Sequence, residues 1–356
     1  MAQSSSSQSV IIVGGGITGL TVAVVLQANG HKVTLIARDA PEETASGVAA
    51  GMIAPAMEAL NDPDPAFSFQ RLKTAQQAWL DLSGIWPEPF RAALAQAQSA
   101  PTFYLWSVGE PSPDMRLSVM GASHVSLSRD ELEAAGFDPE TEGGTRIVGD
   151  WLVDATAVLA ILQTHFEVSG GRVLRETVSH VTARSIILSD GETQSADRVV
   201  IAAGYGARAF AEDVPVLAGL TPIKGHLLDV AGRGGAGIVR SARGYFADYG
   251  ERGKFGATMQ AGQADLGIEP EIVAELHARA GWMNVGIEAA KPRTGVRAST
   301  PDEWPLIGRD PSSGVLVVTG MRRNGYIFAP LAAQIILAQI EERESPDGGV
   351  YRPDRF

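Results

Sequence analysis

The stretch VIIVGGGITGL, residues 10–20, indicates an α/β fold that binds a dinucleotide. Its apolar residues 10–13 are typical of a buried parallel strand, and residues 17–29 (ITGLTVAVVLQAN) predict a mostly apolar helix packed under the sheet. The pattern G-x-G-x-x-G begins between these two segments, at Gly14 and Gly16, and ends inside the predicted helix, at Gly19. The first glycine permits a tight turn, the second lets the backbone approach a pyrophosphate, and the third lets the helix pack closely on the strand. The N-terminus of that helix would attract the phosphates.

The acidic residue that usually accompanies this loop is missing. Residues 31–37 (HKVTLIA) predict the second strand of a βαβ unit, and an Asp or Glu that binds ribose usually ends that strand. The chain has Ala37-Arg38-Asp39 there. Three explanations stay open at this point: Asp39 binds the ribose one or two positions late, Arg38 contacts a phosphate as in NADP-binding proteins, or backbone groups and the hydroxyls of Thr44 and Ser46 replace the acid.

Composition restricts the class of protein. The 356 residues, 45% hydrophobic and 20% charged, suggest about two soluble domains. The chain has no cysteine, which excludes disulfides, cysteine-bound zinc, iron–sulfur clusters and thiol nucleophiles, and we predict no metal site. The net charge of −12 argues against a nucleic-acid partner. No apolar run is long enough for a membrane span and the start lacks a secretory signal, so we expect a disordered tail at 1–8 and a cytoplasmic protein.

The remaining elements follow an interleaved order. Residues 41–60 predict a loop, and residues 86–149 predict short strands, such as 102–108, between turns. Further helices are expected at 67–85, from the N-cap Asp154 to about 166, at 269–280 and at 324–342, and further strands at 172–178, 185–190, 197–202 and 314–320. We therefore predict a discontinuous nucleotide-binding domain of residues 9–85, 145–221 and 291–356. A second domain, of residues 86–144 and 222–290, would be inserted twice.

Four further stretches resemble one family. ASGVAAGMIAP (45–55) is similar to the flavin-contacting segment of the D-amino-acid oxidase and glycine oxidase family, and VVIAAGYGA (199–207) is similar to its second flavin-binding turn. GVRASTPDEWPLIG (295–308) resembles the family segment G-x-R-x-x-[ST]-x-D-x-x-P-x-I-G. TGMRRNGYIFAP (319–330) resembles T-G-H-x-R-N-G-x-x-x-A-P, with Met321 in place of histidine. These ordered motifs cover most of the chain and are more specific than the glycine loop alone.

The resemblance implies an FAD-binding Rossmann-like domain with an interleaved mixed α/β substrate domain whose sheet covers the flavin. It implies FAD as the cofactor, held non-covalently because the chain has no cysteine for a thioether link. Arg38 and the 44–52 loop would replace the missing acid, as in the D-amino-acid oxidase branch. The residues expected to contact FAD are Gly14, Gly16, Ile17, Thr18, Gly19, Ala37, Arg38, Thr44, Ser46, Ala50, Gly51, Met52, Val178, Ala203, Gly204, Arg323, Asn324, Gly325, Tyr326 and Ile327.

Three residues are expected to act on the substrate. Arg297 resembles the arginine that grips the substrate carboxylate, a role that suits the planar fork of a guanidinium; the alternative is a surface arginine. Arg323 resembles a second active-site arginine at the start of the last helix, whose N-terminus would stabilise negative charge on the reduced flavin. Tyr245 resembles a tyrosine that helps bind the carboxylate, and the alternative is an ordinary strand aromatic. Lys224 and His226, in PIKGHL, are assigned no role.

The resulting hypothesis is an enzyme that oxidatively deaminates a small amino acid, such as glycine, sarcosine or a D-amino acid, with molecular oxygen as co-substrate. A dehydrogenase that passes electrons to a quinone is the alternative on the same fold. An NADP-binding protein without amine chemistry is a third reading, motivated by Arg38, and a tRNA-modifying flavoprotein is disfavoured by the charge. A homo-oligomer remains an option.

Overall fold

The computed structural model describes residues 7–107, 109–137, 142–235, 237–283, 285–347 and 349–356. Its first sheet has six strands in the order β19-β20-β12-β1-β2-β8. The paired strands β20, β12, β1, β2 and β8 run parallel, and β19 is antiparallel to β20. The bounds are β1 Ser9–Val13, β2 Lys32–Ile36, β8 Arg172–Leu174, β12 Arg198–Ile201, β19 Leu306–Arg309 and β20 Leu316–Thr319. The predicted βαβ unit is confirmed, because helix α1 (Ile17–Ala28) joins the adjacent strands β1 and β2.

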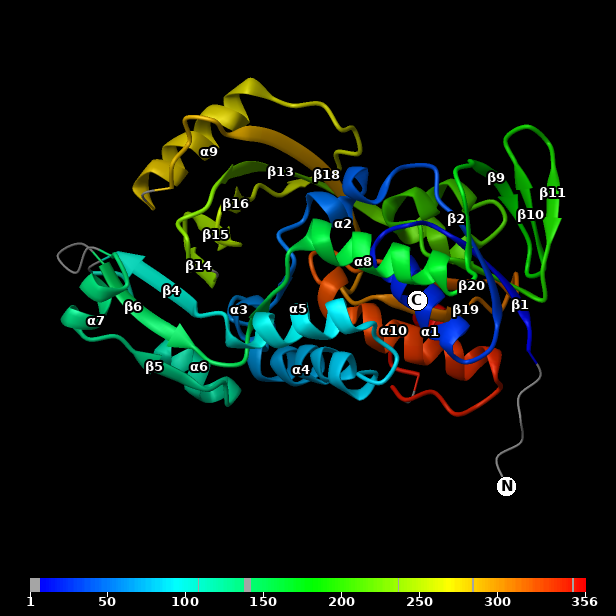
Figure 1. The fold of residues 1–356 in the computed structure, drawn as a ribbon, viewed down its shortest axis with the longest axis horizontal. Helices are drawn as coiled ribbons and strands as arrows, with labels where there is room; N and C mark the ends of the chain where they lie inside the picture. Colours follow the sequence, from blue (N-terminus) through cyan, green and yellow to red (C-terminus); the bar gives the residue numbers. More distant parts are fainter. Residues whose placement is uncertain (1–6, 108, 138–141, 236, 284, 348) are drawn as a thin grey trace.

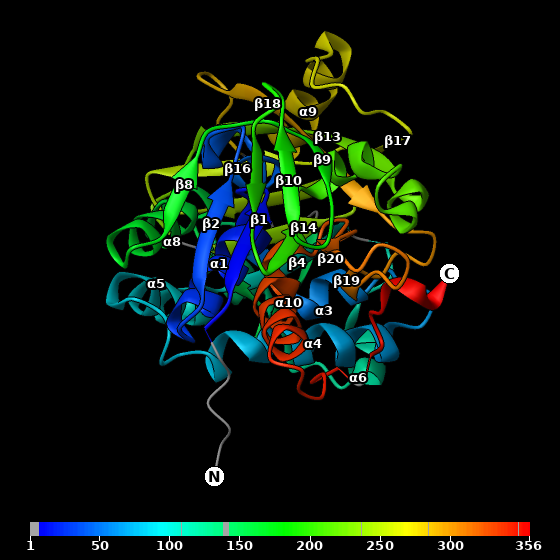
Figure 2. The same ribbon diagram turned by 90° about the vertical axis from the view of Figure 1, so that its right-hand side faces the viewer.

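Different elements cover the two faces of this sheet (Figure 2). Helices α1, α8 (Ala155–Val168) and α10 (Gly325–Ile340) pack with α4 (Pro65–Asp81) in one core, which includes Val10 and Ile12 of β1. Ile11 and Val13 face the other side, where they pack with the three-stranded sheet of β9 (Val178–Val181), β10 (Ser185–Leu188) and β11 (Thr193–Ser195). This alternation along β1 is the period of two expected for a strand buried on both faces.

A second sheet of nine strands forms the other part of the molecule, at the left in Figure 1. Its order is β17-β13-β16-β15-β14-β4-β6-β5, with β18 on the free edge of β13. Helix α9 (Pro270–Trp282) covers the outer face, in a core with Leu228, Phe246 and Phe255. The bounds are β4 Thr102–Ser107, β5 His124–Ser126, β6 Glu142–Ile147, β13 Thr221–Ala231, β14 Gly237–Ser241, β15 Gly244–Asp248, β16 Arg252–Gly256, β17 Gln260–Ala261 and β18 Lys291–Ser299.

Two regions differ from the expectation. Residues 41–60, expected as a loop, contain a 3-10 turn at Pro41–Glu43, α2 (Ala45–Val48), β3 (Met52–Ile53) and α3 (Pro55–Ala59). These elements are too short to show a hydrophobic period. The described residues of the range 86–149 form three helices besides their strands, namely α5 (Glu88–Ser99), α6 (Asp114–Met120) and α7 (Arg129–Ala134). The buried side chains of α5, Phe90, Leu94 and Ala97, follow the helical spacing and were a usable signal.

The expected domain boundaries stay a prediction, and one strand links the two expected domains. Strand β18, inside the segment 291–356 assigned to the nucleotide-binding domain, pairs along its whole length with β13 of the second sheet. Of the tail expected at 1–8, residues 1–6 lie outside the described part, whereas Ser7 Oγ donates to Gly30 O and Gln8 N donates to His31 Nδ1. Shorter elements complete the described fold: β7 Trp151–Leu152, which pairs with β3, and 3-10 turns at Gly204–Phe210, Pro215–Gly219 and Pro353–Arg355. No helix among the described residues has the length and apolar character to cross a bilayer.

Candidate functional site

A cavity of about 530 Å³ lies where the glycine loop, the ends of parallel strands and strand β18 meet. Ligands of open α/β sheets bind at this carboxyl edge of the strands. Predicted residues that line it are Gly14, Gly16, Ile17, Thr18, Ala37, Arg38, Thr44, Ser46, Val178, Ala203, Gly204, Arg297, Arg323, Gly325 and Tyr326. Segments that are far apart in the sequence therefore converge on one hollow, as the resemblance implies.

The glycine loop forms a backbone cradle at one part of this cavity. Gly14 has a φ of 120°, and a Cβ there would lie only 2.5 Å from the carbonyl carbon of Ala202. A Cβ at Gly16, the N-cap of α1, would lie 3.0 Å from Ser46 Oγ. Gly19 does not line the cavity. It packs against Gly14, and a Cβ added to Gly19 would overlap the Gly14 carbonyl oxygen. The loop thus presents backbone and a helix N-terminus to the cavity, which fits a pyrophosphate.

The residues at the end of β2 form an ion pair. Arg38 Nε and Nη2 donate to the Asp39 carboxylate at 2.8 and 2.7 Å, and this hydrogen bond lowers the pKa of Asp39. Both side chains line the cavity, where Arg38 is largely exposed and Asp39 is partly buried. The hydroxyl of Thr44 accepts from Gly47 N and donates to Pro41 O, and Ser46 Oγ accepts from Ile17 N at 3.1 Å. Ser46 therefore ties the 44–48 segment to the start of α1.

Several predicted cofactor contacts lie behind the cavity wall instead of on it. Ala50, Gly51, Met52, Asn324 and Ile327 are not among the lining residues. Gly51 has a φ of 69°, and a Cβ would overlap Val153 O, so this glycine permits a close backbone approach. Asn324 is the N-cap of α10, and Ile327 is fully buried one turn further. These residues shape the wall, and a direct contact with FAD stays a prediction.

Two residues that were not predicted hold the 47–50 segment, one on β16 and one in the connection between β15 and β16. Lys254 Nζ donates to the carbonyl oxygens of Gly47, Val48 and Ala49 at 2.7, 2.8 and 3.0 Å. Burial lowers the pKa of Lys254 to about 8. Tyr249 Oη donates to Ala50 O at 2.6 Å. The wall of the cavity is thereby fixed to the sheet that covers it.

Arg297 and Tyr245 converge on the sheet face that is turned toward the cavity. Arg297, on β18, extends over Gly225 of β13, where a Cβ would lie 2.7 Å from Nη2. Tyr245, on β15, extends over Gly256 of β16, where a Cβ would lie 3.3 Å from the phenol oxygen. The strands β13 and β16 are neighbours, so the two glycines open the space through which these side chains approach one another. Neither glycine was singled out by its sequence context.

Burial shifts the pKa values of both Tyr245 and Arg297. Burial raises the pKa of Tyr245, and the nearby Arg297 partly opposes the rise. Burial lowers the pKa of Arg297, which still stays charged because an arginine is protonated at any physiological pH. Among the described residues, Arg297 has one hydrogen-bond partner, the carbonyl oxygen of Thr258 at 3.3 Å. Most of its donors are thus available to a ligand.

Arg323, the other predicted arginine, is held by carboxylates. Its Nε pairs with Glu58, and its Nη2 donates to Glu58 O at 2.9 Å and reaches Asp62 Oδ1 at 3.4 Å. Glu58 is buried on α3 and also pairs with Arg240 Nη1 at 3.0 Å. Two arginines that flank it lower the pKa of Glu58 against the opposing effect of burial. Neither Glu58 nor Arg240 was predicted, because a buried charge is visible only when its partners are known.

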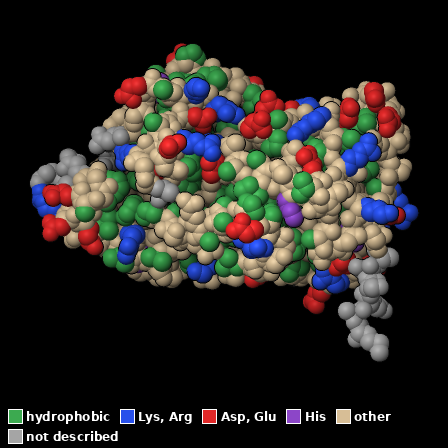
Figure 3. Space-filling view, viewed as in Figure 1, with side chains coloured by type: hydrophobic (Ala, Val, Ile, Leu, Met, Phe, Trp, Pro, Cys, Tyr) green, Lys and Arg blue, Asp and Glu red, His purple; other side chains and the backbone are tan. Residues whose placement is uncertain are grey.

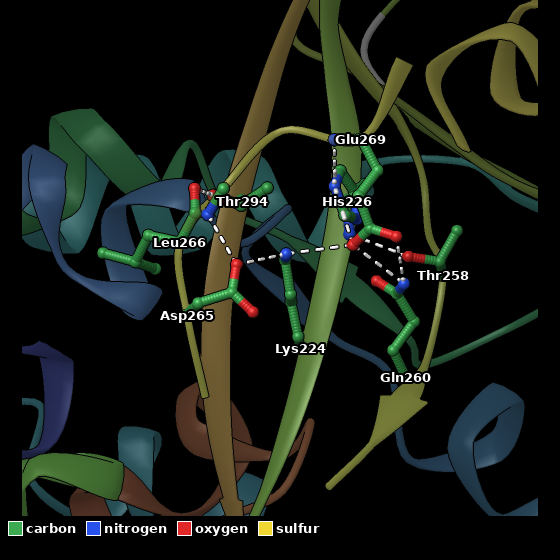
Figure 4. Close-up of polar contacts among 9 residues, drawn as sticks. Lys224, His226, Thr258, Gln260, Asp265, Leu266, Glu269 and Thr294 are labelled. Atoms are coloured by element: carbon green, nitrogen blue, oxygen red, sulfur yellow. Dashed lines mark hydrogen bonds and ion pairs between the residues drawn. The ribbon is translucent and has the colours of Figure 1, made fainter. Parts of the chain in front are cut away.

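Lys224 and His226 lie on the other face of β13, away from Arg297, since their positions alternate with Gly225. Figure 4 shows them in a polar cluster that anchors the chain after β17. Lys224 Nζ contacts Asp265 at 2.6 Å and Glu269 at 3.0 Å, and His226 Nε2 accepts from Glu269 N at 3.2 Å. His226 N donates to Thr258 Oγ1, so the cluster also fixes the segment between β16 and β17, in which the Thr258 carbonyl oxygen accepts from Arg297. Both residues support structure here.

The residues of the cavity fit FAD. The glycine loop leaves no room for a Cβ at Gly14 and so presents bare backbone, which suits the pyrophosphate. The apolar wall formed by Val178, Ala203 and Tyr326 suits flat rings. Tyr326 keeps its hydroxyl on Ser46 O at 3.0 Å, which fixes its ring at the cavity. The arginines at the covering sheet supply the charge that an anionic substrate needs.

Comparisons with known proteins agree with this geometry. The family model of the FAD dependent oxidoreductases (DAO) matches residues 9–339. A glycine oxidase from Bacillus licheniformis is 27% identical over 93% of this chain and 92% of its own length. The crystal structure of glycine oxidase from Geobacillus kaustophilus superposes with a TM-score of 0.81 over 98% of this chain and 99% of that chain, at 23% identity, which supports the fold.

The chain spans only about half the length of two bifunctional relatives. One is the bifunctional protein ThiO/ThiG from Trichormus variabilis, 26% identical over 95% of this chain and 53% of that protein. The other is the tRNA 5-methylaminomethyl-2-thiouridine biosynthesis bifunctional protein MnmC from Polaromonas naphthalenivorans, 25% identical over 94% of this chain and 57% of that protein. The expected fold class and cofactor are confirmed, since the family match covers nearly the whole α/β chain. The protein is an enzyme whose cofactor is FAD, and it belongs to the D-amino-acid oxidase and glycine oxidase family of FAD dependent oxidoreductases.

Proposed function

We propose that this enzyme oxidatively deaminates a small amino acid, with glycine, sarcosine and small D-amino acids as the candidate substrates. The observation that carries the proposal is that Arg297, which lines the cavity with the glycine loop, extends over Gly225 toward Tyr245, a residue of the same sheet face that does not itself line the cavity. A guanidinium with free donors beside a phenol is a binding site for a carboxylate. The cavity therefore offers one anchor for an amino acid and one cradle for FAD.

The residues of the chain would act mainly by orienting the substrate. The fork of Arg297 binds both carboxylate oxygens in one plane, and its burial strengthens that ion pair. Tyr245, whose pKa is raised by burial, stays protonated and can donate to the same carboxylate. With two donors on the carboxylate, the α-carbon has a fixed position, and such positioning contributes a large part of catalysis in flavin enzymes.

FAD supplies the hydride acceptor when it is bound. Amino acid, water and oxygen are then converted to oxo acid, ammonia or amine, and hydrogen peroxide. The N-terminus of α10, which begins at Gly325 beside the cavity, can stabilise negative charge that develops there. Arg323 adds its positive charge at the same place, although Glu58 neutralises part of it.

The relatives named as glycine oxidases support this choice of substrate class. The test is the visible spectrum of the purified protein under anaerobic conditions, before and after addition of glycine, sarcosine, D-alanine or D-proline. We expect one of them to bleach the flavin. A flavin untouched by all four would contradict the proposal. Air admitted after bleaching separates an oxidase, which recolours at once, from a dehydrogenase that needs a quinone.

A second candidate is an amine carried on tRNA, which the match to a tRNA 5-methylaminomethyl-2-thiouridine biosynthesis protein favours. The net charge of −12 weakens it, and acidic and basic side chains intermingle over the face drawn in Figure 3. Retention of tRNA by the purified protein at low salt, with flavin bleaching by the tRNA-bound amine alone, would favour this candidate over free amino acids. A cytoplasmic location and a homo-oligomeric state stay predictions.

A further inference from the structure

The arginines at the cavity differ in how far their charge is already neutralised. Arg297 has a carbonyl oxygen as its one hydrogen-bond partner in the described part of the chain. Arg322 is paired with Glu303 at 2.6 Å. Arg323 is paired with Glu58 and lies 3.4 Å from Asp62. Only the first of these guanidinium groups thus lacks a carboxylate among the described residues.

Glu58 occupies the central position of this arrangement. It is 5% exposed, and it bridges Arg323, from the cavity wall, and Arg240, from the covering sheet. Arg240 lies directly opposite Tyr245 in the β14–β15 register, so the two side chains share the sheet face turned toward the cavity. The charge of Glu58 also acts on Tyr245 and Arg297. A carboxylate of the protein therefore already pairs with two arginines, of which Arg323 lines the cavity and Arg240 lies opposite Tyr245.

We propose that Glu58 makes this enzyme selective for amino acids with a single carboxylate, because it takes the place on Arg240 and Arg323 that a second substrate carboxylate would need. The inference rests on the proposed function, since it takes Arg297 as the anchor of the first carboxylate. A dianionic ligand would put its second charge beside Glu58, and repulsion between like charges in a buried site costs affinity. Glu58 is a specificity-determining residue in this account and takes no part in the reaction itself.

Two ligands of nearly equal shape test the inference without turnover. Succinate carries two carboxylates, and succinamate carries one carboxylate and a neutral amide. Each is titrated into the FAD-loaded enzyme at low salt, and the dissociation constant is taken from the change in the flavin spectrum. For the unchanged enzyme we expect succinamate to bind at least about tenfold more tightly than succinate.

Variants that remove either a carboxylate or an arginine from this arrangement extend the test. Glu58→Gln should reduce that preference to about twofold or reverse it, because Arg240 and Arg323 then lack their shared anion. Arg240→Gln should increase the preference, because Glu58 then has one cation fewer. Asp62→Asn, at a more exposed carboxylate, should reduce the preference partly, and it keeps the test decisive if Glu58→Gln does not fold. Glu275→Gln, on the outer face of α9, is the matched control and should leave the ratio unchanged.

Equal binding of succinate and succinamate to the unchanged enzyme would overturn the inference. So would an unaltered ratio in Glu58→Gln, or in both Asp62→Asn and Arg240→Gln. Failure of both ligands to perturb the flavin would be a different result, because it would remove the carboxylate anchor of the proposed function and this inference with it.

Discussion

The space above Gly225 is the feature whose loss should affect the substrate most selectively. In Gly225→Ala the new methyl group would overlap Arg297 Nη1 and lie 2.7 Å from Nη2 and 2.8 Å from Cζ, whereas ordinary contacts begin at 3.4 Å. The guanidinium must therefore retreat by at least about 0.7 Å. A displacement of about 1 Å in a catalytic arrangement can cost about 100-fold, so we expect kcat/KM for the amino acid to fall about 10- to 100-fold. That loss corresponds to roughly 1.4 to 2.7 kcal/mol.

The fold should tolerate this change, since the displaced group is the far end of a flexible side chain. We expect flavin content to stay equal to that of the unchanged enzyme and Tm to shift by no more than a few degrees. The assay is steady-state oxidation with flavin content and Tm measured on the same samples. Gly281→Ala is the matched control, because nothing lies within 4 Å of its new methyl group, at the end of α9. An unaltered kcat/KM in Gly225→Ala, with intact flavin, would refute the role given to Arg297.

Three further predictions concern the cofactor cradle and two buried charges. Gly14→Ala should lose FAD, with at least about 2 kcal/mol of stability, because its φ is 120° and its Cβ would meet the backbone of Ala202; an equally yellow variant would contradict this. The pKa of Lys254 falls from 10.5 to about 8, so its contribution to stability is full above pH 10.5 and lost as pH falls through about 8. Denaturant titrations should therefore show that the free energy of unfolding of Lys254→Met, relative to the unchanged protein, is greatest below pH 8 and falls as the pH rises toward 10.5; a pH-independent difference would contradict this. Burial raises the pKa of Asp150 from 3.8 to about 7, so its contribution is full below pH 3.8 and lost as pH rises through about 7; the stability of the unchanged protein relative to Asp150→Asn should decline over that window, and a flat difference would contradict the assignment.

The part of the site made by local sequence could be predicted well. The turn at Gly14 and the helix α1 follow from one contiguous stretch, and the glycine has the positive φ that its position in the turn requires. Asp154 caps α8 through Thr156 N and Ala157 N, as its place before an apolar run indicates. Such features depend on neighbours in the chain, and no tertiary contact is needed to recognise them.

The part made by pairing between distant strands could not be predicted. Arg240 faces Tyr245 only because β14 and β15 pair in one register, and Glu58 meets Arg240 across 182 residues of chain. Gly225 and Gly256 resemble ordinary strand glycines until the register shows which side chains extend over them. Lys254 was equally inconspicuous, since its three carbonyl partners belong to a segment that was expected to be a loop. Resemblance supplied Arg297 and Tyr245, and the structure supplied the reason why they can meet.

The proposed function depends on Arg297 as the residue that anchors the carboxylate of an amino acid beside FAD. The most direct measurement is the rate of anaerobic flavin bleaching by the best amino-acid substrate and by its primary amide, in the unchanged enzyme and in Arg297→Gln. We expect the acid to bleach the flavin far faster than the amide, and Arg297→Gln to remove this advantage while the amide reacts as before. If acid and amide bleach the flavin with the same concentration dependence, and Arg297→Gln alters neither rate, Arg297 is not the carboxylate anchor.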